Sequence, residues 1–261
     1  MDGERSRFDR LLKAAAPRPV TDYAPPPLEV APGLWVIERR LRHFGFALLP
    51  TRTIVVRLAD GSLVVISPPA VQGGEALEAI GSLGRVRQVV VPNSFHYLHA
   101  AEFMGELPGA SLLVAPGTAR RAPGLRGASE LDPARPPEGW AGVLELVVLG
   151  PVRGISEVLL FHVPTATLLL TDLAFNMTSY PRPVDRFFWR LSGIPAGLGP
   201  GRTTRSLLLR DRAEARRALS EALAWPIARL VVAHGGMVEE DVRSRLRAAF
   251  RASLGDLPGT G

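Results

Sequence analysis

The stretch of sequence that decides the fold is residues 88–103, QVVVPNSFHYLHAAEF. The segment Arg87–Val91 ends in consecutive valines, which is typical of a strand covered on both faces. A turn follows, and it holds two of the chain's five histidines, His96 and His99. The segment His99–Leu107 then has the spacing of a helix. The rest of the sequence must decide whether this turn forms a metal site or carries two polar loop residues.

The length and composition indicate a globular protein. A chain of 261 residues with 46% hydrophobic and 21% charged residues is able to bury a sizeable core. No apolar run reaches the ~18–20 residues that a membrane helix needs, and the N-terminus lacks the apolar segment of a secretory signal. We therefore expect a cytoplasmic protein with no membrane partner.

The residue usage excludes several kinds of site. The chain contains no cysteine, so disulfides, thiolate metal sites, iron–sulfur clusters and cysteine nucleophiles are excluded. Any metal must be held by His, Asp, Glu or backbone oxygen. The net charge is +6, and a basic balance is one sign of nucleic-acid binding. The arginines, however, are spread along the chain without interleaved aromatic residues, which favours a solvated surface over a polyanion-binding one.

Two blocks of predicted elements follow one another between a lead and a tail. Residues 1–30 predict a short helix and an extended proline-rich lead, residues 31–254 a single domain, and residues 255–261 a flexible tail. The first block predicts strands at residues 34–38, 53–58, 62–67, 87–91 and 111–115 and helices at residues 75–84 and 99–107. The second predicts strands at residues 144–149, 157–162, 167–172 and 228–236 and helices at residues 183–193, 211–225 and 239–254. Two sheets packed face to face, with helices outside, suit this order better than one parallel sheet.

Three histidines and one aspartate lie at or just after the ends of predicted strands, namely His96, His99, Asp172 and His234. Strand ends are where α/β folds gather their chemistry, because the sheet holds the adjoining loops rigidly. A spacing of three puts the rings of His96 and His99 on one side if the turn is helical. A group of three histidines and one aspartate suits zinc, iron or manganese. The alternative is that each of these side chains is a hydrogen-bonded structural residue.

The two other histidines favour structural roles. His162 lies within the predicted strand Glu157–His162 among apolar neighbours, which favours a buried structural residue. His43 lies in RRLRHFGF, residues 39–46, and is expected on the surface or in a loop.

The order of these segments resembles the metallo-β-lactamase fold, a four-layer αββα sandwich. That family places a His-x-His-x-Asp-His segment after an early strand, an Asp at the end of a later strand, and a last His in a Gly-His-type turn. Here SFHYLH (residues 94–99), LLLTD (168–172) and VVAHG (231–235) take these places. The resemblance covers about residues 33–250. It implies an α/β (α+β) fold of this type and an uncharacterised, divergent branch of the superfamily.

The sequence departs from the family's pattern at the metal positions. Ser94 stands in place of the first His, and Leu98 stands in place of the Asp that helps to orient the attacking water. The family's middle His has no clean equivalent, since His162 lies on the following strand. The residues that match the remaining ligand positions are His96, His99, Asp172 and His234. The resemblance therefore implies at most a mononuclear site, for zinc or for another divalent metal such as iron or manganese.

The resemblance also implies an activity, a metal-dependent hydrolase that acts on a small-molecule substrate. Asp172 is then a ligand or the catalytic base that orients water. Three further residues are candidates for contacts with the substrate or with the ligands: Asn93, Ser94 and His162. The alternative is a non-catalytic binding or structural protein of the same fold, whose metal site has decayed. Nucleic-acid processing is a weaker hypothesis, because only the basic charge supports it.

Two proline- and glycine-rich loops are expected to roof the pocket, residues 116–142 and residues 176–202. The second loop adds candidates for substrate contact: Asn176, Tyr180, Arg182 and Trp189. Each of these is also an ordinary loop or helix residue.

Overall fold

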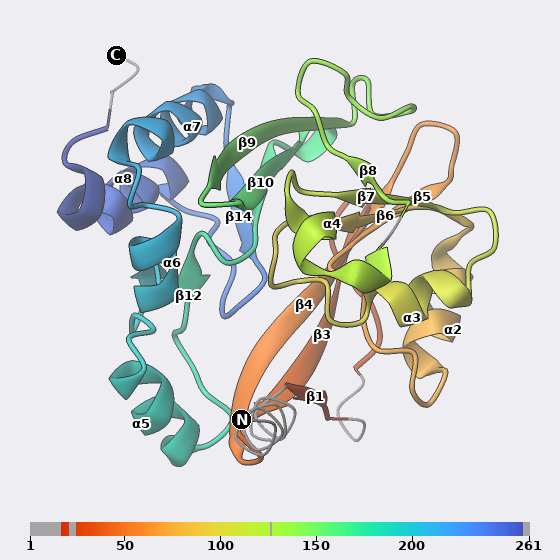
Figure 1. Ribbon diagram of the computed structural model, residues 1–261, viewed down its shortest axis with the longest axis horizontal. Coiled ribbons are helices and arrows are strands. Elements are labelled where there is room, and N and C mark those ends of the chain that lie inside the picture. The colour runs from red at the N-terminus through yellow and green to blue at the C-terminus, as the bar shows by residue number, and fades with distance from the viewer. Residues whose placement is uncertain (1–16, 21–24, 126, 258–261) are drawn as a thin grey trace, which may run out of the picture.

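The first half of the chain forms a mixed sheet that builds one side of the molecule (Figure 1). This computed structural model describes residues 17–20, 25–125 and 127–257. The sheet has eight strands in the order β1-β3-β4-β5-β6-β7-β8, with β2 paired to β3. These strands are β1 (Arg18–Pro19), β2 (Leu28–Ala31), β3 (Leu34–His43), β4 (Ala47–Arg57), β5 (Leu63–Ile66), β6 (Val86–Val91), β7 (Ser111–Val114) and β8 (Ser129–Glu130).

The second half of the chain forms a four-stranded sheet in the order β14-β11-β10-β9. Its strands are β9 (Leu144–Val152), β10 (Ile155–His162), β11 (Thr167–Leu170) and β14 (Arg229–Val232). The predicted hairpin is confirmed as β10 and β11, and β14 returns from far along the chain to lie parallel to β11. Two short strands, β12 (Phe175–Asn176) and β13 (Leu198–Gly199), pair with each other.

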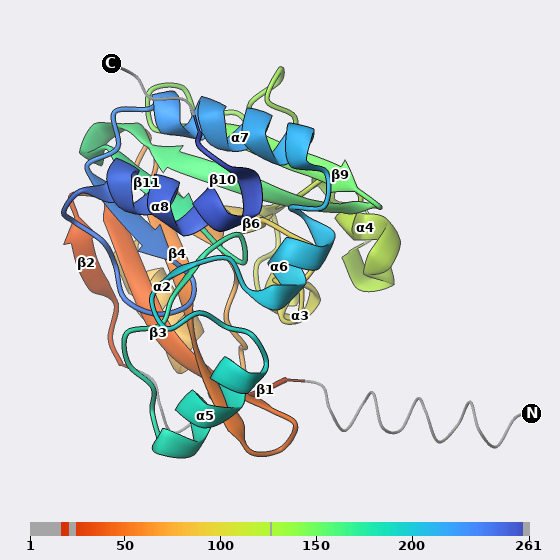
Figure 2. The same cartoon turned by 90° about the vertical axis from the view of Figure 1, so that its left-hand side faces the viewer.

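Helices cover the outer face of each sheet, which gives four layers (Figures 1 and 2). The helices of the described residues are α2 (Glu75–Leu83), α3 (Ala100–Gly105), α4 (Thr118–Arg121), α5 (Pro183–Leu191), α6 (Arg202–Leu207), α7 (Arg212–Ala224) and α8 (Val242–Leu254), with 3-10 turns η1 (Pro123–Leu125) and η2 (Val163–Thr165). Ile80 of α2 and Phe103 of α3 are buried against the first sheet. Leu219 of α7 and Phe250 of α8 are buried against the second. The predicted four-layer αββα sandwich is confirmed.

The core between the two sheets contains a large aromatic residue, Trp140, which is fully buried. It packs among apolar residues of both sheets, such as Ile54 of β4 and Leu160 of β10. Its indole Nε1 donates a hydrogen bond to Gln88 Oε1 at 2.7 Å. A buried indole N–H needs such a partner, so Gln88 of β6 allows the ring to fill this position.

Local sequence signals explain several of the turns and helix ends. Gly61 adopts a φ of 82° in the predicted Asp-Gly turn between β4 and β5, and Asp60 Oδ1 accepts a hydrogen bond from Ser62 N at 2.9 Å. Asp211 caps α7, as predicted, because its Oδ1 accepts a hydrogen bond from Glu214 N at 3.0 Å.

The hairpin of β3 and β4 extends further than the sequence predicts. Three of the residues 39–43 are arginines, so their composition favours no strand. In the structure this run pairs with β4 as far as His43 and Ala47. Ala47 is buried against Trp189 of α5, so tertiary packing rather than local propensity extends the strands. His43 is half-buried with its ring centroid 5.0 Å from that of Trp189, and its predicted place on the surface or in a loop is wrong.

Some predictions concern residues outside the described ranges. The predicted N-terminal helix falls on residues 1–16, and most of the predicted tail falls on residues 258–261. In the proline-rich lead, residues 28–31 form β2. Among the described residues, no helix has both the length and the apolar character needed to traverse a bilayer.

Candidate metal centre

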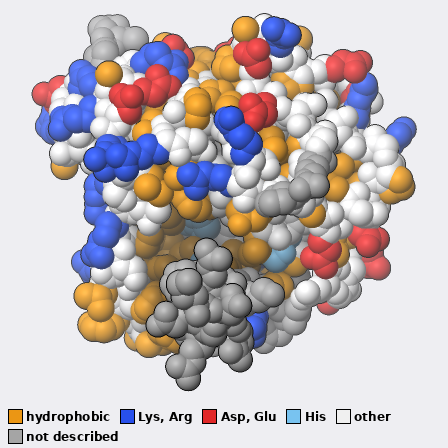
Figure 3. All heavy atoms as spheres, viewed as in Figure 1, with side chains coloured by type: hydrophobic (Ala, Val, Ile, Leu, Met, Phe, Trp, Pro, Cys, Tyr) orange, Lys and Arg blue, Asp and Glu red, His pale blue; other side chains and the backbone are white. Residues whose placement is uncertain are grey.

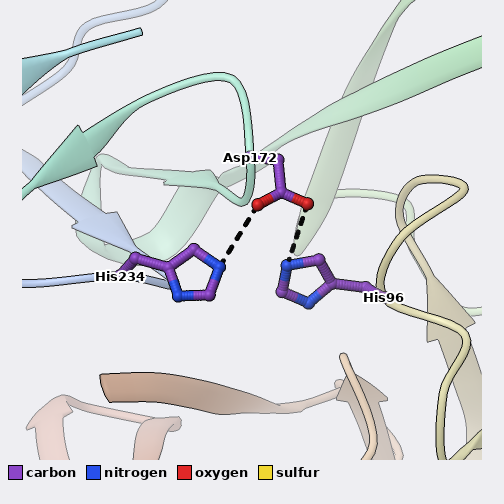
Figure 4. A group of neighbouring side chains, drawn as sticks. All are labelled: His96, Asp172 and His234. Carbon is purple, nitrogen blue, oxygen red and sulfur yellow. Dashed lines mark ion pairs between the residues drawn. The ribbon is translucent and has the colours of Figure 1, made fainter. Parts of the chain in front are cut away.

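Three of the four predicted ligands meet at one edge of the two sheets (Figure 4). Asp172 follows β11 and His234 follows β14, and these strands run parallel with Leu170 opposite Val232. Both side chains therefore leave the second sheet at the same edge. His96 arrives from the first sheet, on the loop after β6. Its Nε2 lies 3.3 Å from Asp172 Oδ2, and His234 Nε2 lies 3.2 Å from Asp172 Oδ1.

The donor atoms of these three residues lie close enough together that they could hold a metal ion. One ligand atom from each residue lies within 4.8 Å of the other two. Zinc–ligand bonds of about 2.0–2.2 Å in a tetrahedron separate neighbouring ligand atoms by roughly 3.3–3.6 Å. Two imidazole nitrogens and a carboxylate oxygen are donors that zinc, iron and manganese accept. The group of His96, Asp172 and His234 can therefore hold a metal ion.

Asn93 fixes the position of His96. Its side-chain Oδ1 accepts hydrogen bonds from Phe95 N at 2.7 Å and from His96 N at 2.9 Å, which closes an Asx turn. On its other side, Asn93 Nδ2 donates to Asp172 Oδ2 at 3.0 Å. These bonds show that Asn93, the sequence-based candidate for a supporting role, contacts the site. Asn93 is also fully buried.

Four residues hold His234 in place. Its ring stacks on Phe175, with centroids 5.0 Å apart, and its Nδ1 donates to Pro50 O at 2.8 Å. The following Gly235 has a φ of 102°, and a Cβ at this position would lie 2.1 Å from the carbonyl oxygen of Asn176. Only glycine fits there. Arg52 donates from Nη1 to Val232 O at 3.0 Å and also to the carbonyl of Gly235, which ties the turn to β4.

The electrostatics keep Asp172 ionised. Burial by itself raises the pKa of the Asp172 carboxyl, but the neighbouring His96 and His234 outweigh it and hold that pKa well below its usual range. An ionised carboxylate suits a metal ligand. It is a poor proton acceptor, however, which weakens the sequence-based expectation that Asp172 is a catalytic base.

A second carboxyl group, Glu157, lies fully buried beneath Asp172. Its oxygens accept hydrogen bonds from Asn93 Nδ2 at 2.7 Å, from Thr171 N at 3.1 Å and from the Thr171 hydroxyl. Burial, together with the charge of Asp172, raises the pKa of Glu157 to about 8. Glu157 is therefore mainly protonated at neutral pH. Sequence reasoning missed it, although a lone acid in the otherwise apolar strand EVLLFH is a usable signal.

His99 does not join the group. The predicted helical turn, which would align the rings of His96 and His99, is absent because α3 begins only at Ala100. His99 instead lines the pocket, and its Nε2 is buried without a hydrogen-bond partner. Its expected place among ligands that share one ion is therefore not supported by this geometry.

Two of the candidate supporting residues are engaged elsewhere. Ser94 Oγ lies 3.2 Å from Thr118 Oγ1, although Ser94 also lines the pocket. His162 is buried at the far end of β10, opposite Thr167, while Asp172 lies past the other end of β11. Its Nδ1 is 2.7 Å from Thr165 Oγ1. The expectation that His162 contacts the ligands or substrate is wrong, because the strand carries it away from the site.

A pocket of about 540 Å³ opens in front of the three residues. Its floor is the extended hairpin of β3 and β4, and its walls come from residues 17–20, 67–76 and 94–99. Figure 3 shows histidine side chains in this hollow, bordered by hydrophobic ones. Floor residues that the sequence reasoning missed include His43 and Arg52. Their signal was weak, since His43 follows the arginine-rich run RRLR and Arg52 is a single arginine beside a predicted strand.

The predicted roof is wrong in its main part. Among the described residues, the loop 116–142 contributes Arg121 to the pocket, and the loop 176–202 contributes no lining residue. The four candidates from the second loop instead support the fold. Asn176 N donates to His234 O at 2.9 Å, while Tyr180, Arg182 and Trp189 pack or bond near the turn of the β3–β4 hairpin.

Comparison of the sequence with models of protein families identifies the family to which the chain belongs. The sequence matches the family described as "Domain of unknown function (DUF4336)" over residues 33–188. The chain belongs to the DUF4336 family. The matched region contains His96 and Asp172 but ends before His234, so this member's candidate metal centre extends beyond it. No curated protein matches the sequence.

Solved structures establish the fold of this DUF4336 protein. It is similar to the metallo-β-lactamase FIM-1 from Pseudomonas aeruginosa in its mono-zinc form, with 15% identity, a TM-score of 0.62, and coverage of 88% of this chain and 97% of that one. It is also similar to a metallo-β-lactamase from Pontibacter korlensis, with 12% identity, a TM-score of 0.61 and coverage of 88% and 99%. The flavodiiron protein from Giardia intestinalis gives 15% identity and a TM-score of 0.61, over 87% of this chain and 59% of that one. The DUF4336 chain therefore has the metallo-β-lactamase fold.

Proposed function

We propose that this protein is a metal-dependent hydrolase with one divalent cation held by His96, Asp172 and His234. The observation that carries the proposal is the orientation of His234. Its Nδ1 donates to Pro50 O, so in the neutral ring Nε2 carries a lone pair. That lone pair faces the carboxylate oxygen of Asp172 at 3.2 Å. At this distance a cation must lie between the two electron-rich atoms, either a metal ion or a proton on Nε2, and the metal-content measurement below distinguishes the two.

Zinc and iron are the ions to test first. Two histidines and one carboxylate leave open positions on zinc, as in catalytic zinc sites, and the same donor set occurs in iron enzymes. Among proteins of this fold, one metallo-β-lactamase is described in a mono-zinc form and another relative as a flavodiiron protein. Manganese remains a third possibility for this donor set.

The roles of the chain's own residues follow from their positions. A bound divalent ion would supply Lewis-acid activation of water and of a carbonyl or phosphoryl group. Asp172 contributes the negative charge that holds the ion, and the two histidines complete its protein ligands. Asn93 and Pro50 orient the ligands through the hydrogen bonds given above. The largely apolar walls of the pocket limit access of bulk water to the bond that is cleaved.

A non-catalytic binding protein of the same fold is the second candidate. The observation that favours it is Leu98, which stands where the family resemblance expects a water-orienting Asp. Leu98 is 40% exposed and cannot orient water. This candidate predicts that no turnover of esters, lactones or phosphodiesters accompanies metal binding, or that no metal binds.

The test is the metal content of the untagged full chain, measured by plasma mass spectrometry, with wild type beside His96→Ala, His234→Ala and His99→Ala. We expect close to one ion per wild-type chain. Removing either ligand should lower metal affinity by more than about 100-fold, beyond what the loss of a supporting hydrogen bond costs. His99→Ala is the matched control, since it removes an imidazole from the same loop and pocket. It should retain the metal.

Two results would contradict the proposal. A wild-type protein that takes up no zinc, iron or manganese after incubation with each ion cannot work as described. A His99→Ala variant that loses metal as completely as His96→Ala would replace the three-residue group with a different ligand set. With metal bound, a screen of esters, lactones and phosphodiesters then separates the hydrolase from the binding protein.

A further inference from the structure

Ser67 is a strained residue whose hydroxyl has no partner inside the protein. It follows β5 directly and adopts a φ of 57°, which is uncommon for a residue other than glycine. Its backbone is well held, because its N–H donates to Val90 O at 2.9 Å and its carbonyl accepts from Thr53 Oγ1 at 2.7 Å. The residue lines the pocket and is 6% exposed, and its buried Oγ makes no hydrogen bond. Backbone strain of this kind gathers at ligand sites.

Two histidines in the same pocket share this property. The Nε2 atoms of His43 and His99 are buried and have no hydrogen-bond partner, and both residues line the pocket. Burial lowers the pKa of His43 to about 4 and also lowers the pKa of His99. Both rings are therefore uncharged at neutral pH. A neutral imidazole hydrogen-bonds a carbonyl, hydroxyl or amide group but gives no charge to an anion.

The arginines that line the pocket are engaged with the protein itself. Arg39 donates to the carbonyls of Pro25 and Glu38, and Arg40 also has an interaction within the protein. Arg121 donates to the carbonyls of residues 153 and 154. Arg52 donates to two carbonyls of the 232–235 turn and pairs with Glu38.

Negative charge also lines the pocket, from Glu75 and, while no metal ion is bound, from Asp172. The arginines that line the pocket keep their positive charge, but the N–H groups described above already donate to protein oxygens. An anion would therefore gain few new hydrogen bonds from them to offset the cost of its desolvation. The unpartnered groups at Ser67, His43 and His99 are instead matched to uncharged polar atoms.

We infer that the pocket takes an uncharged substrate with an apolar body, whose carbonyl, hydroxyl or amide group hydrogen-bonds Ser67. This inference rests on the proposed function for the identity of the site, and it narrows the substrate to neutral esters, lactones or amides. Phosphate esters and free carboxylic acids are the classes it disfavours. Ser67 acts here as a binding residue, and the ligand supplies the hydrogen-bond partner that the Ser67 hydroxyl lacks within the protein.

The test measures binding, so that it does not depend on metal or on turnover. The full chain, freed of metal with a chelator, is titrated with octanamide and with octanoate in ligand-observed NMR at neutral pH. The two probes share chain length and shape and differ in charge. Wild type is compared with Ser67→Ala and with Ser94→Ala. Ser94 is the matched control, because it lines the same pocket but its hydroxyl already contacts Thr118.

We expect octanamide to bind wild type at least about 10-fold more tightly than octanoate. Ser67→Ala should weaken octanamide binding about 3- to 10-fold, the loss of one hydrogen bond, and Ser94→Ala should leave it unchanged. Octanoate binding as tightly as octanamide, or no binding of either probe, would overturn the inference. So would equal octanamide affinity in wild type and Ser67→Ala. If the protein binds octanamide as expected but holds no metal, the proposed hydrolase function is contradicted and this inference about the ligand is not.

Discussion

At the scale of single residues, the arrangement around Asn93 decides how the site is held. One amide side chain contacts the backbone of His96, the carboxylate of Asp172 and the carboxyl of Glu157. The ligand from the first sheet is thereby fixed against the ligand from the second. A residue with only one kind of polar atom cannot serve both sides, because Oδ1 accepts where Nδ2 donates.

The buried Glu157 predicts an unusual dependence of stability on pH. Its pKa is raised from 4.5 to about 8 in the fold, so the folded state keeps a proton that the unfolded chain loses. The stability that this proton provides is complete below pH 4.5 and is lost as the pH rises through 8. Between about pH 7 and 8.5, stability should fall by up to about 1 kcal/mol per pH unit.

The check is urea unfolding of chelator-treated protein across that pH range, with Glu157→Gln beside wild type. The variant cannot ionise at this position, so its stability should be flat with pH, whatever its absolute value. An equal downward slope in both proteins would show that another group titrates.

The candidate site was predictable from residues that are scarce and lie at strand ends. His96, Asp172 and His234 meet because parallel strands deliver their ends to one edge, and that rule can be applied to a sequence. The rest depended on local geometry. The sequence does not reveal that the turn before Ala100 is non-helical, so it could not separate His99 from His96. Ser67 and Arg52 carry no signal in the sequence, because their surroundings are formed by residues that lie far away along the chain.

At the scale of elements, α5 holds the hairpin that forms the pocket floor. Asp185, buried on α5, accepts hydrogen bonds from Leu48 N at 2.9 Å and from Arg182 Nη2 at 2.6 Å. Burial raises the pKa of Asp185, but the bonds from Arg182 and Leu48 outweigh it, so the net shift is downward. The ionised Asp185 therefore holds α5 against β4 through its hydrogen bond from Leu48 N.

Asp185→Ala should lower the free energy of unfolding by about 1–3 kcal/mol at pH 7, because it leaves the buried Leu48 N–H without an acceptor. Asp185→Asn is the control. It keeps an acceptor for Leu48 and loses only the charge that pairs with Arg182, so its loss should be smaller. Urea unfolding of the three proteins checks the order. An Asn variant as unstable as the Ala variant would assign the effect to charge alone.

Most elements were predictable from local pattern, and tertiary packing explains one of the exceptions, the extension of β3. The hairpins at residues 53–67 and 157–172 and the helices α2, α7 and α8 follow from β-branched runs, turn residues and apolar spacing. The extension of β3 and the helix α6 did not appear in the sequence-based prediction. Residues 39–43 are strand because Trp189 and the buried end of β4 cover that part of the hairpin. This is a tertiary contact, which the local sequence pattern does not reveal.

At the scale of the whole molecule, the two sheets depend on their shared core. Trp140→Ala should cost about 3–5 kcal/mol, since it removes a fully buried indole and leaves a cavity. It also leaves Gln88 Oε1 without its donor. Trp140→Phe keeps most of the ring volume and loses the N–H, so it should cost less. Chemical unfolding measures both values, and a cost for the Ala variant below about 1 kcal/mol would contradict this account of the core.

The fold of the whole was more predictable than any single contact in it. Segment order along the chain is enough to indicate two face-to-face sheets with outer helices, because each amphipathic element must bury one face. The predicted domain limits, residues 31–254, stay a prediction.

The parallel pairing of β14 with β11 has a consequence for how the chain is made. Leu170 and Val232 are neighbours in the sheet, yet roughly 60 residues separate them along the chain. At ribosomal speeds of about 5–20 residues per second, β11 waits about 3–12 s for its partner. During that interval the emerging polypeptide carries an apolar strand with an unpaired edge, which is a template for wrong association. We expect nascent chains that are stalled before residue 229 to bind chaperones. Chains whose β14 has emerged from the ribosome should bind fewer chaperones.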